Sequence, residues 1–174
     1  MRALSLRIAE VEILQMRAWT GIGMNLKEFD FHEFAEVDFP SPKGALPGPP
    51  DGYVYVFFWV TKNVEIPFYV GETARLSGRM NDYAIASFSA CTDFQVGEAA
   101  RYLKEVKNCR IVVRYKQSAE REKEGKYLTR ELTLAGVRLL KCLPSYNYRD
   151  SDPSEERTVV QRFCDMLISL GNLD

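Results

Sequence analysis

The apolar residues at the start of the chain have helical spacing. They recur at three- and four-residue steps, which predicts an amphipathic helix through Leu4, Ile8, Val11, Leu14 and Ala18. From Phe29 to Phe39, aromatic residues alternate loosely with acidic or polar ones, a pattern compatible with a strand. Residues 1–39 are therefore interpreted as an N-terminal extension.

A Pro- and Gly-rich segment then interrupts the pattern. Residues 40–52 contain five prolines and three glycines in thirteen positions. Proline fixes its own backbone dihedral and lacks an N–H donor, whereas glycine widens the backbone choices, so this composition predicts a loop or linker. We place the boundary of the main domain here, with a core at residues 53–148 and a C-terminal helix at residues 152–171 packed on it.

Three short segments after the linker have the composition of β-strands. Residues 53–60 read YVYVFFWV, a run of β-branched and aromatic residues that predicts a strand. Residues 67–71 follow after a short turn, and this spacing predicts an antiparallel hairpin. The third strand is expected at residues 109–115.

Helical patterns lie between and after these strands. We expect a helix that Thr73 caps and that runs through Tyr83, a second helix at roughly residues 97–107, and a long one at residues 118–143. Asp152, followed by Pro and with Glu three residues on, predicts the start of the last helix. The predicted fold class is α+β, a small three-stranded antiparallel sheet flanked by helices.

The composition excludes several kinds of chemistry. The chain has 174 residues and a formal net charge of −1, with a single His and four Cys. One His rules out a multi-His zinc centre and argues against catalysis by an imidazole base. The cysteines are far from C-x-x-C spacing, which favours neither a metal cluster nor a disulfide framework. Because no uncharged apolar run reaches membrane-spanning length, we expect a soluble, cytoplasmic protein.

Positive charge is concentrated in one part of the chain. Residues 101–141 hold twelve Lys or Arg against five Asp or Glu, whereas the flanking regions are net negative. A basic stripe on a nearly neutral protein can still neutralise nucleic-acid phosphates, although the same pattern is typical of a solvated helix face.

The predicted hairpin and the helix after it carry the residues suited to chemistry. Tyr53 and Tyr55 share one face of the first strand, and Tyr69 lies across from them in a hairpin. Arg79 and Tyr83 are four residues apart and share a helix face. Such an array suits a phosphodiester, because Arg binds two phosphate oxygens at once and a phenol can orient or deprotonate water.

These residues resemble the signature of the GIY-YIG nuclease family over residues 53–147. The matching positions are, in chain order, Tyr53-Val54-Tyr55 for G-I-Y, Tyr69-Val70-Gly71 for Y-I-G, then Thr73, Leu76, Arg79, Tyr83 for the family's His or Tyr, and Pro144-Ser145-Tyr146-Asn147 for its Pro-x-x-Asn ending. In this chain a tyrosine replaces the glycine of G-I-Y.

One family residue has no counterpart at its usual position. The interval from Asn147 that leads to the family's metal-binding glutamate ends here at Ala135. Glu131 lies one helical turn earlier on an apolar stripe, where a carboxylate needs a partner or a metal. We therefore assign the metal ligand to Glu131, with a ligand from elsewhere or a lost metal site as alternatives. The resemblance also implies that Asn147 ties the helix end to the site.

The resemblance implies an endonuclease that hydrolyses phosphodiester bonds of DNA, with RNA as a further possible partner, and that uses one Mg²⁺ or Mn²⁺ ion held by Glu131. Tyr55 or Tyr69 would position and deprotonate the attacking water. Arg79 would bind the scissile phosphate, assisted by Tyr83. The residues expected to contact nucleic acid beside the site are Arg75, Lys126, Arg130 and Arg138.

Two other hypotheses fit parts of the sequence. The missing glutamate, the replaced glycine and the near-neutral charge also suit a catalytically inactive nucleic-acid-binding module on the same fold. A protein-interaction domain with a coincidental signature would instead use the segment 29–39 or the apolar face of the last helix. A homodimer through the N-terminal extension or this last helix is also expected to be possible. The distances among Tyr55, Tyr69, Arg79 and Glu131 separate the first hypothesis from the others.

Overall fold

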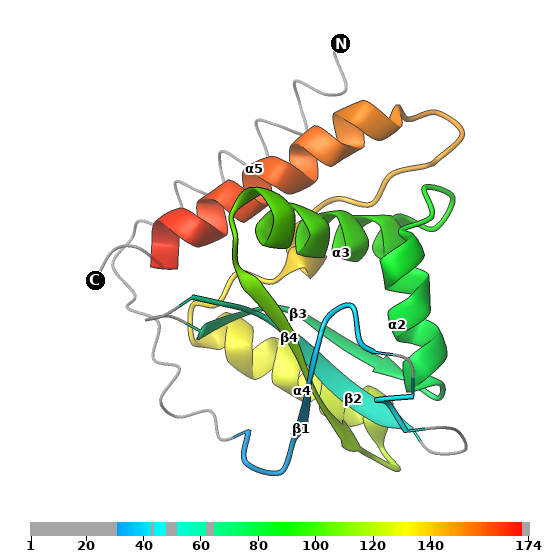
Figure 1. Ribbon diagram of the computed structural model, residues 1–174, viewed down its shortest axis with the longest axis vertical. Coiled ribbons are helices and arrows are strands. Elements are labelled where there is room, and N and C mark those ends of the chain that lie inside the picture. Colours follow the sequence, from blue (N-terminus) through cyan, green and yellow to red (C-terminus); the bar gives the residue numbers. More distant parts are fainter. Residues whose placement is uncertain (1–30, 43, 48–51, 62–64, 172–174) are drawn as a thin grey trace.

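Four antiparallel strands form the single sheet of the computed structural model, which describes residues 31–42, 44–47, 52–61 and 65–171 (Figure 1). The strands are β1 (Ala35–Asp38), β2 (Tyr53–Val60), β3 (Glu65–Thr73) and β4 (Arg110–Gln117), in the spatial order β1-β4-β2-β3. The helices are α2 (Leu76–Ile85), α3 (Cys91–Arg101), α4 (Arg121–Leu134) and α5 (Pro153–Gly171). The α+β class is confirmed, but the sheet has four strands rather than three. The helix expected at residues 4–18 lies outside the described residues.

The expected hairpin is present and forms the centre and one edge of the sheet. β2 pairs with β3 along its whole length, so that Tyr55 lies opposite Gly71 and Phe57 opposite Tyr69. The register shifts after Phe57, which leaves Phe68 as the extra residue of a β-bulge. Cross-strand partners point to the same face, so Tyr69 shares the face of its partner Phe57. Tyr55 lies two residues before Phe57 in β2 and is therefore on this face too.

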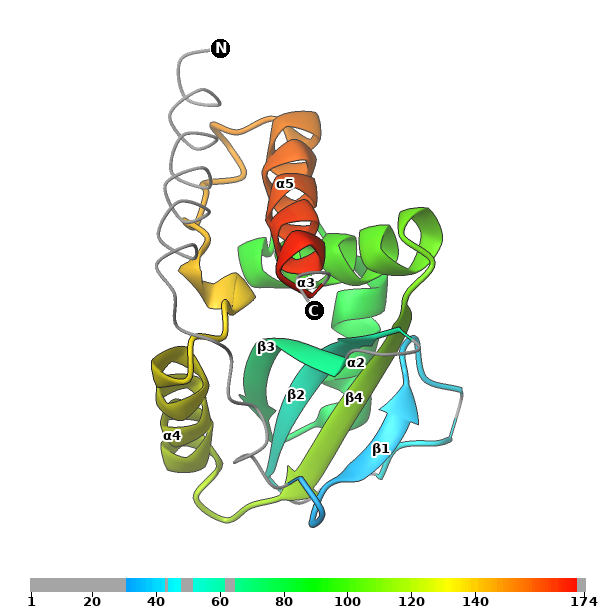
Figure 2. The same cartoon turned by 90° about the vertical axis from the view of Figure 1, so that its left-hand side faces the viewer.

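Helices cover both faces of the sheet (Figures 1 and 2). Alternate residues of β2 separate the two cores: Tyr55 and Phe57 pack with side chains of α2, α3 and α5, whereas Val56 and Phe58 pack on the other face against Leu132 of α4. Both sets of alternate residues in β2 are buried, so the strand has no solvent-facing side. This explains why its sequence has no charged or strongly polar residue.

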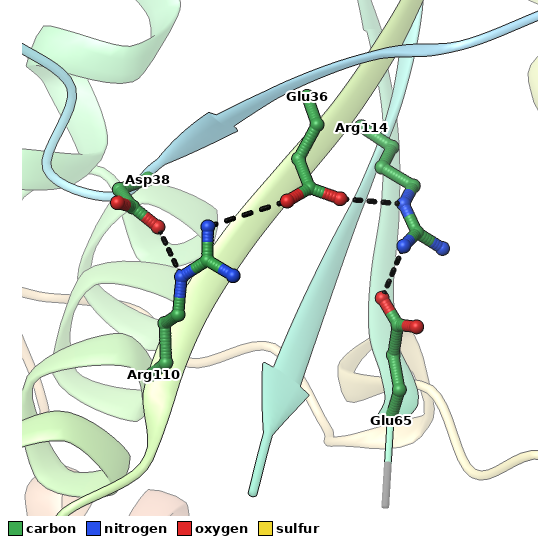
Figure 3. Close-up of polar contacts among 5 residues, drawn as sticks. All are labelled: Glu36, Asp38, Glu65, Arg110 and Arg114. Carbon is green, nitrogen blue, oxygen red and sulfur yellow. Dashed lines mark hydrogen bonds and ion pairs between the residues drawn. The ribbon is translucent and has the colours of Figure 1, made fainter. Parts of the chain in front are cut away.

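β1 comes from the end of the predicted N-terminal extension and adds an edge to the sheet. It pairs antiparallel with β4. Glu36 and Asp38 accept hydrogen bonds from Arg110, and Glu36 also accepts one from Arg114 (Figure 3). Arg114 reaches over β2 to Glu65 of β3, so ion pairs through the arginines of β4 connect both edges of the sheet. The segment before the linker is therefore part of the same sheet as the segment after it.

The second helix begins earlier than its sequence predicts. Residues 97–107 were expected to be helical, but α3 begins at Cys91, and the residues from Tyr102 to Val106 form a wider π-helical turn. All residues from Phe94 to Ala100 are buried. Because the buried residues include the polar Gln95 and Glu98 beside apolar ones, the sequence has no clear apolar stripe that would mark the start of this helix.

The helix after β4 is shorter than expected. Instead of residues 118–143 it spans α4 only, and it ends in a Schellman motif at Gly136, whose φ is 88°. The N–H of Gly136 donates to the carbonyl of Thr133, and the N–H of Val137 donates to that of Leu132. Glycine is favoured at this left-handed position, and the contact between apolar residues on both sides of it completes the motif.

The chain then passes around the β3 edge of the sheet from one core to the other. Val137 and Leu139 are buried with α4, whereas Leu140 and Leu143 are buried on the opposite face. A 3₁₀ turn, Leu140–Cys142, lies at the crossing and contacts β3.

The last helix is confirmed. The carboxylate of Asp152 accepts hydrogen bonds from the backbone N–H groups of Ser154 and Glu155, as an N-cap does. The apolar face of α5, including Phe163, is buried against the rest of the chain. That face is therefore used within the molecule.

Candidate functional site

Three tyrosines and one arginine meet where the hairpin joins α2. The Tyr83 hydroxyl lies 2.7 Å from that of Tyr55 and 3.0 Å from that of Tyr69. Arg79 donates from Nε to the Tyr83 oxygen at 3.1 Å, and its guanidinium carbon lies 4.4 Å from the Tyr83 ring centroid. We call these four residues the tyrosine–arginine cluster. The structure thus brings together four of the six predicted catalytic residues, from two strands and one helix.

The hydrogen bonds in the cluster have a defined direction. Tyr83 donates its one proton to Tyr69, so the bond between Tyr55 and Tyr83 has Tyr55 as donor. With the bond from Arg79, the Tyr83 oxygen accepts twice and donates once, which uses its full capacity. Tyr69 accepts from Tyr83, and its own proton is not used in these bonds. Tyr69 is therefore the phenol of the cluster that can donate to a ligand.

Gly71 makes room for the Tyr55 ring. The two residues are opposite each other in the hairpin, and a Cβ atom on Gly71 would lie 2.3 Å from both Cζ and the hydroxyl oxygen of Tyr55. The phenol thus leans across the glycine toward Tyr83. The glycine of the Y-V-G motif has a steric role in the cluster, in addition to any effect on the turn into α2.

The phenols are held in their neutral form. Burial raises the pKa of Tyr83 and Tyr55 far above the ordinary tyrosine value, and it raises the pKa of Tyr69, where the hydrogen bond from Tyr83 acts in the opposite direction. Burial acts to lower the pKa of Arg79, but the facing oxygens of Tyr83, Tyr55 and Asp93 outweigh it and the pKa is raised. At neutral pH the cluster is three neutral phenols beside one cation.

Asp93 is a member of the site that the sequence did not reveal. Its carboxylate lies 2.5 Å from Nη1 of Arg79, and Asp82 is further away at 3.8 Å. Asp93 is in the first turn of α3, and the expected helix began after it, so nothing in the sequence placed it near Arg79. The side chain of Arg79 is 26% exposed, so part of it is open to a ligand. Asp93 both fixes the guanidinium and offsets its charge.

A cavity of about 370 Å³ opens beside Tyr69. It lies between α3 and the segment that crosses the β3 edge, and it is lined by Tyr69, Cys91, Thr92, Gln95, Val96, Leu140, Lys141, Leu143 and Ser145. Gln95 donates from Nε2 to the carbonyl of Pro144 at 3.1 Å, which attaches the Pro-x-x-Asn segment to this wall. We call this the Tyr69 cavity. Its hydroxyl groups can donate or accept hydrogen bonds, and Lys141 is the one cation among the described residues of its lining, so it suits an anionic ligand.

Glu131 and Asn147 are not part of the tyrosine–arginine cluster. α4 packs on the opposite face of the sheet (Figure 2). Thr129 lies on the flank of α4 near Lys141, and Glu131 is two residues later, about 200° further round the helix and so on the other flank. Asn147 is exposed and bonds to Asp150 within its own turn. In the part of the chain that the structure describes, no hydrogen bond or ion pair joins either residue to the cluster.

The cluster does not have the ligands of a Mg²⁺ site. Mg²⁺ prefers carboxylate oxygens and several waters. Nowhere within the described ranges do three His, Cys, Asp or Glu side chains gather in a way that could hold a metal ion. Asp93, the carboxylate nearest to Arg79, is already ion-paired, and Glu131 is on a distant flank of α4. These side chains therefore do not fit a Mg²⁺ ion at the cluster.

The four residues predicted to bind nucleic acid lie at three different places in the structure. Lys126 and Arg130 line a groove of about 340 Å³ on the outer side of α4, together with Thr129, Thr133, Leu134 and Lys141. We call this the α4 groove. Arg75 is exposed at the start of α2, where its N–H donates to the Thr73 hydroxyl. Arg138 follows the Schellman motif, and its Nε is buried without a hydrogen-bond partner among the described residues.

Most of the other cations of residues 101–141 are neutralised by carboxylates. The members in ion pairs are Arg101, Lys107, Arg110, Arg114, Lys116, Arg121 and Lys123. Lys104, Lys126, Arg130, Arg138 and Lys141 form no ion pair with another described residue. Three of them, Lys126, Arg130 and Lys141, lie together at the α4 groove and beside the Tyr69 cavity, whereas Lys104 lies apart on the turn after α3.

None of the helices within the described ranges has both the length and the apolar composition needed to cross a lipid bilayer. Searches of protein-family models, curated proteins and solved structures found no match to this chain.

Proposed function

We propose that this protein is an endonuclease of GIY-YIG type that binds nucleic acid and hydrolyses a phosphodiester bond at the tyrosine–arginine cluster. The observation that carries the proposal is the meeting of Tyr55, Tyr69, Arg79 and Tyr83 within one hydrogen-bonded group, in the order and on the elements that the sequence resemblance implies. β2 and β3 are neighbours in the sheet, so the tyrosines do not lie on opposite sides of the molecule, as a coincidental signature would allow.

Each residue of the cluster has a role that follows from its contacts. Arg79 is held by Tyr83 on one side and by Asp93 on another, so its partly exposed guanidinium is fixed in place for a phosphate oxygen. Tyr69 has a proton left to donate to a phosphate oxygen or to an attacking water. Tyr55 and Tyr83 are buried and neutral, and they orient the other two residues.

A second candidate function is nucleic-acid binding without cleavage. It is favoured by the position of Glu131, which lies on the flank of α4 that faces away from the Tyr69 cavity. Among the described residues, Glu131 forms no metal-holding group with the residues of the cluster. The raised pKa values of the phenols point the same way, because a neutral phenol is a weak base. The cations of the α4 groove would serve this function as well as the first.

The two functions are distinguished by measuring cleavage and binding on the same purified protein. Duplex, branched and single-stranded DNA and an RNA strand are incubated with Mg²⁺ or Mn²⁺, with EDTA as the control. Cleavage by the wild type and its loss in Arg79→Gln, with activity retained in the matched variant Arg110→Gln, supports the nuclease. Arg110 is also ion-paired but lies on the other face of the sheet.

Salt-dependent binding of these substrates without any product supports the binding module instead. If the protein neither binds nor cleaves any of these substrates, both functions are eliminated. The variant Glu131→Gln tests the metal ligand that the sequence implies: cleavage that persists at the wild-type rate would remove Glu131 from the reaction.

A further inference from the structure

The proposed site lacks net positive charge at Arg79. Asp93 lies 2.5 Å from the guanidinium, so the pair together is close to neutral, and the three phenols carry no charge. A phosphodiester has one full negative charge and is bound better by a site with a compensating cation. If the proposed function is correct, a second cation is therefore expected next to Tyr69.

Lys141 is the cation in that position. Its ammonium lies 5.8 Å from the centroid of the Tyr69 ring. It lines both the Tyr69 cavity and the α4 groove, and so connects them around the β3 edge. The backbone there is fixed, because Leu140 and Leu143, on either side of Lys141, are buried in the core.

The charge of Lys141 is not used elsewhere in the described structure. It forms no ion pair with another described residue, whereas Lys116 on β4 is paired with Glu124. Although Lys141 as a residue is exposed, the surroundings of its ammonium desolvate it and lower its pKa, and the charge of Glu72 only partly opposes this. Such an ammonium lacks a close anion, and a phosphate would supply one.

We infer that Lys141 is a phosphate-binding residue of the site, and that the backbone of the nucleic acid passes from the α4 groove, at Lys126 and Arg130, past Lys141 to Tyr69. The ligand is recognised through its phosphates along this path, so binding depends on charge and not on base sequence. Lys141 adds to the predicted set a residue that neither the motif nor the spacing identified.

The test compares Lys141→Gln with the wild type in EDTA, so that binding is measured without cleavage. The probes are fluorescently labelled duplex DNA, single-stranded DNA and RNA, each titrated at several salt concentrations. Glutamine keeps part of the side-chain stem and removes the charge. We expect affinity to fall about tenfold at low salt, and the slope of log K against log salt to become less negative by about 0.9 for duplex DNA or about 0.7 for a single strand.

The matched control is Lys104→Gln, an exposed lysine on the π-helical turn after α3 that forms no ion pair with another described residue. It should leave both affinity and slope unchanged, and Lys141→Arg should restore both. If the wild type binds and Lys141→Gln binds equally well with the same slope, the inference is overturned while the proposed function stands. If the wild type binds none of the probes, the proposed function fails and the inference falls with it.

Discussion

Replacing Gly71 with alanine tests whether the glycine of the Y-V-G motif is needed for space or for backbone freedom. No positive φ is required at Gly71, and alanine in a strand is otherwise favoured over glycine by about 0.5–1 kcal/mol. If the backbone freedom of glycine were needed, alanine would strain the chain where β3 leads into α2. If space is the issue, the new Cβ meets the phenol of Tyr55 at 2.3 Å.

The cost of that collision can be estimated from what Tyr55 loses. Tyr55 is 1% exposed and cannot move aside without disturbing a packed core, which costs about 1–3 kcal/mol. Displacing its hydroxyl from Tyr83 leaves a buried donor unpaired, at a further cost of about 1–3 kcal/mol. After subtracting the alanine preference, we expect Gly71→Ala to lower the free energy of unfolding by about 1–5 kcal/mol.

Urea denaturation followed by tryptophan fluorescence measures this difference. The matched control is Gly78→Ala in α2, where the nearest atom to the new Cβ is 3.8 Å away and a gain in stability of about 0.5–1 kcal/mol is expected. A double-mutant cycle with Tyr55→Leu should remove most of the cost, because the ring is gone. A change below about 0.5 kcal/mol in the otherwise wild-type protein, or the same cost when Tyr55→Leu is already present, would refute the steric explanation.

Three further predictions concern the supports of the cluster. Gly97→Ala places a Cβ 2.2 Å from the carbonyl oxygen of Tyr83 where α3 crosses α2, and thermal unfolding should show a loss of about 3 kcal/mol; an unchanged Tm would contradict this contact. Asp93→Asn leaves the charge of Arg79 uncompensated, so DNA affinity measured by anisotropy at low salt should rise about fivefold, and a fall would mean that Asp93 mainly orients the guanidinium. The pKa values of Tyr55 and Tyr83 are raised, so the folded state holds these protons more tightly than the unfolded chain does; their stabilisation is complete below the ordinary tyrosine pKa of about 10 and is lost as the pH rises above it. Urea titrations should show this decline, and it should be smaller in Tyr83→Phe.

The sequence was sufficient where local pattern and packing agree. The run YVYVFFWV predicts β2 because its residues suit a strand buried on both faces, and Asp152 predicts the start of α5 through a cap that needs only neighbouring residues. The positions of Tyr55, Tyr69, Arg79 and Tyr83 also follow from local periods, since strand alternation and the four-residue helical step orient them once the hairpin forms.

Other features depend on contacts between distant segments. The apolar residues after Ala135 continue the helical pattern, and only the left-handed conformation of Gly136 ends α4 before them. The pairing of Asp93 with Arg79 and the position of Lys141 beside Tyr69 are set by how α3 and the crossing segment pack on the sheet, which no short-range pattern encodes. The assignment of the metal ligand to Glu131 depended on its place on an apolar helical stripe, and the pattern could not show that α4 packs on the sheet face opposite to the cluster.

The crossing segment also has a consequence for how the protein behaves in a crowded solution. β3 is an edge strand, and an open edge is a template on which the strand of another molecule can pair and start aggregation. Here Pro67 and the bulge interrupt the row of N–H donors, and the 3₁₀ turn at Leu140–Cys142 lies against the strand. The opposite edge is only the four residues of β1. An opening for a ligand can therefore persist beside Tyr69 at an edge that is poorly suited to extending the sheet from one molecule to the next.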